Sequence, residues 1–138
     1  MRGRFFIDTN ILVHANDTSN PEKRSEARLL IARALETRRG CLSTQVLQEF
    51  FVVVTSKAGV APENARAQIL ILGQLDTVIP DEDLIVRAVD LHIIHHVSFW
   101  DALIVQAARS AGCGTLLTED LQDGQVIEGV RVENPFRS

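Results

Sequence analysis

Three large apolar residues, Phe5-Phe6-Ile7, run directly into the carboxylate of Asp8 near the start of the 138-residue chain. An apolar run without alternation is typical of a strand covered on both faces, as in a parallel sheet flanked by helices. Ligands bind such sheets just beyond the carboxyl ends of the strands. The run therefore predicts a buried strand that presents Asp8 at a ligand-binding edge. Asp8 or Asn10 would equally serve as the cap of a short helix that begins near Ile11.

Length, composition and charge restrict the class of protein. The chain has the length of one domain, which we expect to span residues 1–138, and its 46% apolar and 23% charged residues are ordinary for a globular fold. Neither a signal peptide nor an apolar run of roughly 18 residues is visible, so we expect a cytoplasmic protein that does not enter a membrane. A net charge of -4 excludes bulk attraction to nucleic acid, so such a ligand would need local basic side chains or bound cations. Cys41 and Cys113 have apolar or small neighbours and suit buried thiols.

Helix and strand signals alternate along the chain. Asn20-Pro21-Glu22 marks a helix start, and we expect this helix to last about 17 residues and to end at Arg38-Arg39-Gly40. A strand is expected at residues 40–43, then a helix capped by Ser43 or Thr44, whose end is open because Val52-Val53-Val54-Thr55 favours a strand. Further helices are expected at residues 62–72, 81–93 and 102–111, and further strands at 77–79, 115–118 and 130–132. This alternation predicts an α/β fold with a central, mainly parallel sheet of four to five strands and helices on both faces.

Four acids occupy comparable places in this pattern: Asp8, Glu49, Asp101 and Asp120 follow strands or lie in the first turns of helices. The ends of parallel strands meet at one edge of a sheet, so these carboxylates are expected to converge. Two unit charges about 4 Å apart repel by roughly 4 kcal/mol at an effective dielectric constant near 20, so the cluster must be protonated or hold cations. Oxygen ligands alone favour Mg²⁺ or Mn²⁺ over Zn²⁺.

Each acid also has a purely structural interpretation. Asp101 stands three residues after Ser98, the spacing of a capping box, and Glu49 suits a solvated helix face. Glu119 and Asp120 suit an ordinary turn. Together these interpretations require four coincidences at one edge of the sheet.

Four segments, in this order and at these spacings, resemble the PIN domain family, and within it the VapC-type toxins of toxin-antitoxin pairs. The segments are Phe6-Ile7-Asp8-Thr9-Asn10, Ser43 to Glu49, Ser98-Phe99-Trp100-Asp101-Ala102-Leu103-Ile104 and Leu117-Thr118-Glu119-Asp120-Leu121. The resemblance covers essentially the whole chain and implies a three-layer α/β/α PIN-like fold.

The resemblance also implies an activity and partners. It implies an endoribonuclease that cleaves RNA phosphodiester bonds with Mg²⁺ or Mn²⁺, held by Asp8, Glu49, Asp101 and Asp120. Asn10 and Thr118 match polar positions that help to arrange the site. The family further implies the toxin component of a type II, VapBC-like pair, a cognate antitoxin and a homodimer. The chain departs from the family pattern at His95-His96, and Asp123 offers a second candidate for the last acid.

Other functions stay open on the residues alone. An aspartyl-phosphate phosphotransferase suits Asp8 but usually has a second acid two residues later, where this chain has Asn10. A phosphorylated signalling domain would need a lysine after a late strand, and none occurs beyond Lys57. A non-catalytic RNA-binding or assembly module is a further alternative. Trp100 suits base stacking less well than a core or interface position, and His92 and His96 lack a third metal ligand.

Overall fold

A six-stranded sheet with the order β3-β2-β1-β4-β6-β5 runs through the computed structural model, which describes residues 3–137. All neighbouring strands are parallel except β5 and β6, which form an antiparallel hairpin. The elements, in chain order, are β1 (Phe5–Ile7), α1 (Thr9–His14), α2 (Pro21–Thr37), β2 (Gly40–Ser43), α3 (Thr44–Ser56), α4 (Pro62–Leu72), β3 (Asp76–Val78), α5 (Glu82–His95), α6 (Phe99–Ser110), β4 (Thr115–Leu117), β5 (Val126–Ile127) and β6 (Val130–Glu133).

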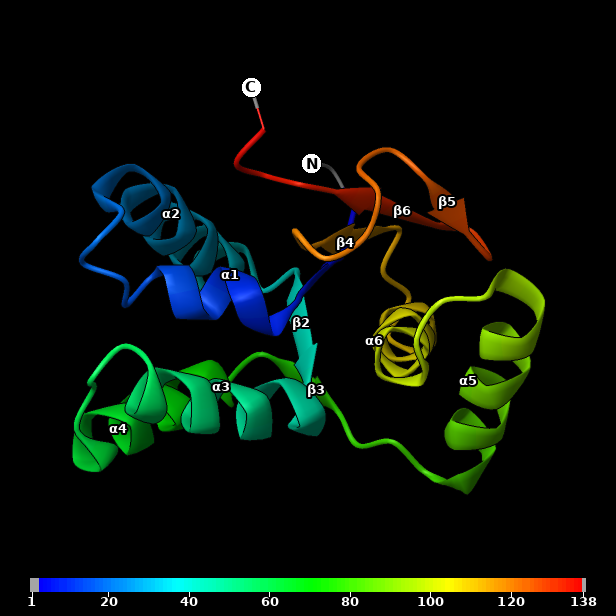
Figure 1. The fold of residues 1–138 in the computed structure, drawn as a ribbon, viewed down its shortest axis with the longest axis horizontal. Helices are drawn as coiled ribbons and strands as arrows, with labels where there is room; N and C mark the ends of the chain where they lie inside the picture. Colours follow the sequence, from blue (N-terminus) through cyan, green and yellow to red (C-terminus); the bar gives the residue numbers. More distant parts are fainter. Residues whose placement is uncertain (1–2, 138) are drawn as a thin grey trace.

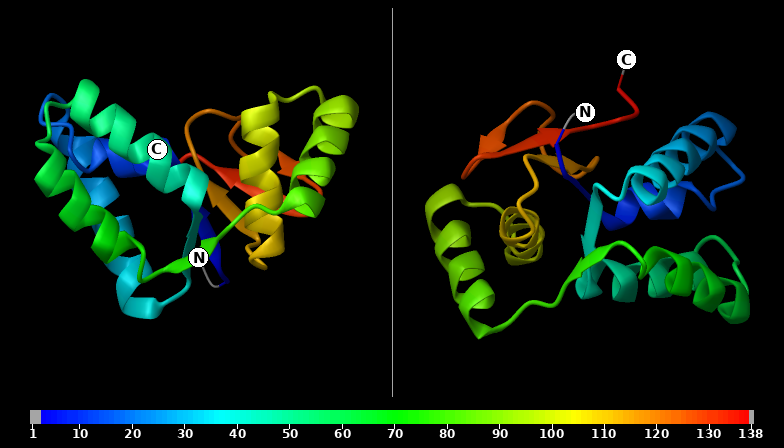
Figure 2. Two further views of the ribbon diagram at one scale, coloured as in Figure 1. Left: turned by 90° about the horizontal axis from the view of Figure 1, so that it is seen from below. Right: turned by 180° about the vertical axis from the view of Figure 1, so that it is seen from behind.

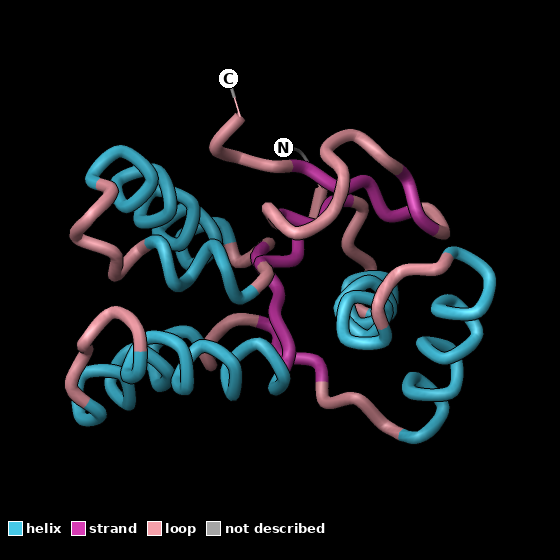
Figure 3. The backbone as a smooth tube through the Cα atoms, viewed as in Figure 1, coloured by secondary structure: helices cyan, strands magenta, loops and turns pink. Residues whose placement is uncertain are grey.

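The helices form a layer on each side of the sheet. Figure 1 shows α1 to α4 on one side and α5 and α6 on the other, and the views from below and behind in Figure 2 show the same division. In Figure 3 the strands lie between the two groups of helices. The predicted three-layer α/β/α architecture is confirmed, with one strand more than the four to five expected, because β5 pairs with β6.

Strand β1 occupies the centre of the sheet, between β2 and β4. From β1 the chain builds β2 and β3 on one side and then returns to place β4 on the other, so the strand order reverses between β1 and β4. Such a reversal opens a crevice at the carboxyl ends of the two strands. Ile7 is in register with Leu117, and the Asp8 N–H donates to the Leu117 carbonyl at 3.1 Å. Asp8 and Thr118 therefore leave the sheet side by side at this crevice.

The strand that precedes Asp8 is buried on both faces, as predicted. Phe5, Phe6 and Ile7 are each at most 1% exposed. Full burial of an apolar side chain of this size contributes about 1.5–3 kcal/mol, so β1 is anchored firmly before it presents Asp8.

Side-chain caps start the helices where the sequence indicates. Asn20 accepts a hydrogen bond from the Lys23 N–H at 3.2 Å, and α2 has 17 residues. Ser43 accepts a hydrogen bond from the Val46 N–H at 3.4 Å, which resolves the choice between Ser43 and Thr44 for α3.

Helix α3 continues through the segment for which strand propensity was high. Val52 to Thr55 lie within α3, which ends at Ser56. The stripe of Val46, Phe50 and Val54, spaced by four residues, is fully buried along one face of this helix. Tertiary packing of this face outweighs the β propensity of the individual valines.

Gly40 begins β2, as the predicted strand at residues 40–43 requires, and is not the glycine cap of α2. Helix α2 ends at Thr37, and Arg38 caps it in a left-handed conformation with φ of 58°. A Cβ atom on Gly40 would lie 2.3 Å from the Ala34 Cβ and 3.1 Å from the Ala34 Cα. Glycine at this position lets α2 pack directly on β2, the strand that leads into α3.

Cys41 and Cys113 are buried free thiols, as the sequence predicted. Among residues 3–137, no single helix is both long and apolar enough to cross a membrane; α5 and α6 reach that length and composition only as a pair bent by 119°.

Gly40→Ala should destabilise the fold, because the added methyl group overlaps Ala34. We expect a loss of about 1–3 kcal/mol in the free energy of unfolding, measured by urea denaturation. Gly114→Ala is the matched control, because a Cβ there meets no atom within 4 Å. Equal stability of the two variants would contradict the close packing of α2 on β2.

Candidate metal centre

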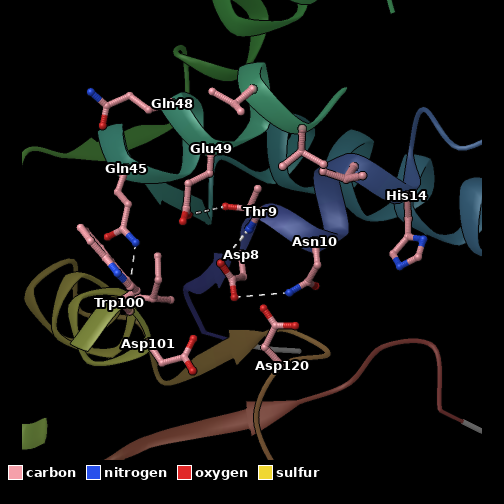
Figure 4. Close-up of a pocket in the computed structure, with 14 residues that line it drawn as sticks. Asp8, Thr9, Asn10, His14, Gln45, Gln48, Glu49, Trp100, Asp101 and Asp120 are labelled. Atoms are coloured by element: carbon pink, nitrogen blue, oxygen red, sulfur yellow. Dashed lines mark hydrogen bonds between the residues drawn. The ribbon is translucent and has the colours of Figure 1, made fainter. Parts of the chain in front are cut away.

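A cavity of about 530 Å³ lies at the crevice between β1 and β4, and all four predicted acids line it. Asp8 and Asn10 come from the end of β1 and the start of α1, Glu49 from α3, Asp101 from α6, and Asp120 from the turn after β4. Figure 4 shows the carboxylates of Asp8, Asp101 and Asp120 facing a common space, with Glu49 on the opposite wall.

Asp8 is the most constrained of these acids. Its side chain caps α1 by accepting the Thr9 N–H at 2.7 Å, and its other oxygen accepts the Thr118 hydroxyl at 2.8 Å. The residue is only 6% exposed. Burial raises the pKa of Asp8 to about 6, against the hydrogen bonds from Thr118 and Thr9, and the negative charges of Asp120 and Glu49 add to the rise. The Asp8 carboxylate thus both caps α1 and lines the cavity.

Thr118 and Asn10 join the two chain segments that leave β1 and β4. The fully buried Thr118 hydroxyl accepts the Asn10 side-chain amide at 3.0 Å and the Asp120 N–H at 3.0 Å. The Asn10 side-chain carbonyl accepts the Glu119 N–H at 3.2 Å. These contacts hold Asp8 and the Asp120 turn together across 110 residues of sequence.

Asp101 and Glu49 approach from helices on the two sides of the sheet. The Asp101 N–H donates to the Ser98 hydroxyl at 3.1 Å, so Ser98 caps α6 while the half-buried Asp101 side chain lines the cavity. Burial raises the pKa of Asp101, opposed by the Ser98 hydroxyl and reinforced by Asp120. The Thr9 hydroxyl donates to Glu49 at 3.0 Å and orients its carboxylate.

The donors in the cavity suit a hard cation. In the part of the chain that the structure describes, no group of three His, Cys, Asp or Glu side chains is arranged so that it could hold a metal ion directly. Mg²⁺ needs few direct protein ligands, since it commonly binds through one or two carboxylates and keeps several water molecules. The buried Asp8 and the half-buried Asp101 have raised pKa values and face a cavity wide enough for such water, which fits a hydrated divalent ion.

Comparisons with known proteins show the family and the fold. The sequence matches the family model of the PIN domain over residues 5–122. The chain belongs to the PIN domain family. A comparison of its sequence with curated proteins finds no match.

The fold of this PIN domain is similar to several solved toxin structures. A toxin-antitoxin complex from Klebsiella pneumoniae is 23% identical with a TM-score of 0.70, covering 96% of this chain and 98% of that one. DNA-bound VapBC from Salmonella typhimurium is 20% identical with a TM-score of 0.69, covering 96% and 98%. VapC20 from Mycobacterium tuberculosis, described as a toxin that cleaves the sarcin-ricin loop, is 16% identical with a TM-score of 0.64, covering 84% and 89%.

Other candidate residues of the PIN domain lie away from the cavity. Asp123 accepts the Asn134 N–H at 2.8 Å and does not line the cavity. His92 bonds the Val97 carbonyl at 2.6 Å, and His96 adopts the left-handed conformation that ends α5. These histidines therefore serve the end of a helix, as the lack of a third ligand suggested.

Glu119, the neighbour of Asp120 in the turn after β4, pairs with His14 and Lys23 instead of facing the cavity. Burial alone would raise the pKa of Glu119, but hydrogen bonds from Lys23 and His14 hold it below its ordinary value. Its carboxylate is thus a charged partner of Lys23 and a hydrogen-bond acceptor for His14.

His14 and Thr9 were not predicted as residues of the site. Trp100 is 63% exposed and lines the cavity, so a core position is wrong, while an interface position and base stacking stay predictions. His14 also lines the cavity, and Thr9 orients Glu49. The position of Thr9 directly after Asp8, in the first turn of α1, was the available signal for its role.

In metal-free buffer, Asp8→Asn should stabilise the folded protein more at about pH 8 than at about pH 4. The pKa of Asp8 in the folded state is about 6, above its ordinary value of 3.8. Protonated Asp8 therefore contributes fully to the stability of the fold below pH 3.8, and this contribution is lost as the pH rises through about 6. The difference between variant and wild type in free energy of unfolding should change by about 2–3 kcal/mol between these conditions. Urea denaturation at both pH values measures it, and a difference independent of pH would contradict the burial of a charged Asp8.

Proposed function

We propose that this PIN domain is a divalent-metal-dependent endoribonuclease and the toxin component of a VapBC-like type II toxin-antitoxin pair. The observation that carries the proposal is the convergence of Asp8, Glu49, Asp101 and Asp120 on one cavity at the reversal of the strand order. All four are separate in the sequence, and they share the wall of this cavity. Carboxylates gathered in this way need a counter-charge.

The similar structures support the same activity. VapC20 is described as a toxin that cleaves the sarcin-ricin loop, and two of the other structures are VapBC complexes with DNA. Membership of the PIN family and the shared fold make a nuclease of the toxin class the simplest interpretation of the acidic cavity.

The residues of the chain would act by position and charge. Asp8, Asp101 and Asp120, with Glu49, would hold Mg²⁺ or Mn²⁺, and Thr118 and Asn10 keep Asp8 in place. When bound, such an ion lowers the pKa of a water molecule and stabilises charge on a scissile phosphate. The hydrogen bonds to Asp8 and the Thr9 contact to Glu49 fix the carboxylates before substrate arrives, which limits the reorganisation that cleavage requires. Cleavage by this route leaves a 5′-phosphate and a 3′-hydroxyl.

An antitoxin and a second copy of the chain are the proposed protein partners. An acidic cavity attracts a cationic side chain such as arginine, so an antitoxin segment would block the site by the same electrostatics that binds metal. Phe51 and Val52 on α3 are 38% and 61% exposed, and their side of α3 is the proposed dimer surface. We place the protein in the cytoplasm, where its RNA substrate is available.

The alternative activities receive less support from the geometry. An aspartyl-phosphate enzyme usually has its second acid at the position of Asn10. The Asn10 side-chain amide instead forms hydrogen bonds with the Thr118 hydroxyl and the Glu119 N–H. A non-catalytic RNA-binding module would not explain why four carboxylates, which repel phosphate, line one cavity.

Asp8→Asn and Asp101→Asn should each reduce metal-dependent RNA cleavage by more than roughly 100-fold, because each removes a carboxylate of the proposed centre. The assay incubates purified protein with total RNA, with Mg²⁺ or with EDTA, and maps the ends of the products. Circular dichroism should show that both variants keep the fold.

Asp90→Asn, an exposed acid on α5 outside the cavity, is the matched control and should cleave like wild type. Full activity of Asp8→Asn, or cleavage by wild type that persists in EDTA, would contradict the proposal. RNA binding without any cleavage by wild type would favour the non-catalytic module.

A further inference from the structure

Glu119 lies next to Asp120 in sequence but points to a different set of partners. His14, the last residue of α1, donates from Nε2 to one oxygen of the Glu119 carboxylate. Lys23, in the first turns of α2, donates from Nζ to the other oxygen at 2.5 Å. One carboxylate thus joins the turn after β4 to two helices that precede it by about a hundred residues of sequence.

The C-terminal segment covers this junction. The Phe136 ring packs edge-on against the His14 ring, with centroids 4.9 Å apart, and the Lys23 ammonium lies 5.3 Å from the centre of the same ring. The Glu119 side chain is only 22% exposed. Shielding from water strengthens the attraction between the carboxylate and the Lys23 ammonium beyond that of an open surface pair.

The Asp120 carboxylate, in contrast, depends on its turn for its position. Among residues 3–137, the hydrogen bonds at Asp120 involve its N–H, which donates to Thr118, and none holds its carboxylate. The turn is fixed on one side by the contact of the Glu119 N–H with Asn10 and on the other by the Glu119 side chain. Loss of the side-chain contacts would leave the turn tied by its backbone alone.

The geometry points to Glu119 as a positioning residue: by joining His14 and Lys23, it holds the turn after β4 so that the Asp120 carboxylate stays directed into the cavity. This inference rests on the proposed function, because its consequence is a higher affinity of the cavity for a divalent cation. Glu119 itself does not touch the cavity. The Lys23 ammonium balances the charge of its carboxylate, so Glu119 adds no net negative charge to the acidic cluster.

The test compares Glu119→Gln and Lys23→Met, which keep the size of each side chain and remove the charge pair. Isothermal titration calorimetry with Mn²⁺ measures the dissociation constant of each folded variant, and circular dichroism checks the fold. Each substitution should weaken Mn²⁺ binding roughly 10-fold, the effect expected when a residue that orients a metal ligand is lost. The double variant should bind Mn²⁺ no more weakly than Glu119→Gln alone, since Glu119→Gln already removes the charged partner of Lys23.

Glu128→Gln is the matched control, because Glu128 is also part-buried, pairs with Arg109 at 3.0 Å and lies outside the cavity. Its Mn²⁺ affinity should equal that of wild type. If Glu119→Gln fails to fold, Lys23→Met alone decides the outcome.

Three results would overturn the inference, and they separate it from the proposed function. Wild-type binding of Mn²⁺ by the folded Glu119→Gln variant, or additive losses in the double variant, would reject the positioning role while the nuclease proposal stands. Absence of Mn²⁺ binding in the wild-type protein would reject both.

Discussion

The buried carboxylate of Asp8 is the constraint on which the arrangement of the site depends. Burial and the nearby charges of Asp120 and Glu49 both disfavour its ionised form, while the Thr118 hydroxyl and the Thr9 N–H favour it. Such a group lowers stability unless the fold holds it tightly and a cation balances it. The apolar strand Phe5–Ile7 and the Thr118 contact supply the first condition, and a divalent ion in the cavity would supply the second.

Much of the fold and the convergence of the acids could be predicted from local signals. Side-chain caps such as Asn20 and Ser43 act within four residues of sequence, so helix starts are visible without tertiary information. The βαβ rule places strand ends at one edge of a sheet, and this was enough to bring Asp8 and Asp120 to one cavity. The cavity lies beside β1 and β4 because the strand order reverses between these two strands.

The features that escaped prediction depend on contacts between distant segments or on an overlooked turn. The end of α3 is decided by burial of Val54, and the close packing of Gly40 on Ala34 is visible only in the folded protein. The antiparallel strand β5 follows from a two-residue turn, Glu128-Gly129, in which both residues have positive φ; a residue-glycine pair between short β-branched runs was its only signal. The pairing of His14 with Glu119, 105 residues apart, had no local signal at all.

The central claim is that a divalent cation occupies the space between carboxylates that are distant in sequence. Anomalous diffraction from crystals of the wild-type protein grown with Mn²⁺ tests it most directly. The account predicts a strong anomalous peak bound by Asp8 and by at least one of Asp101 and Asp120. A cavity without such a peak, or Mn²⁺ bound only elsewhere on the protein, would contradict it.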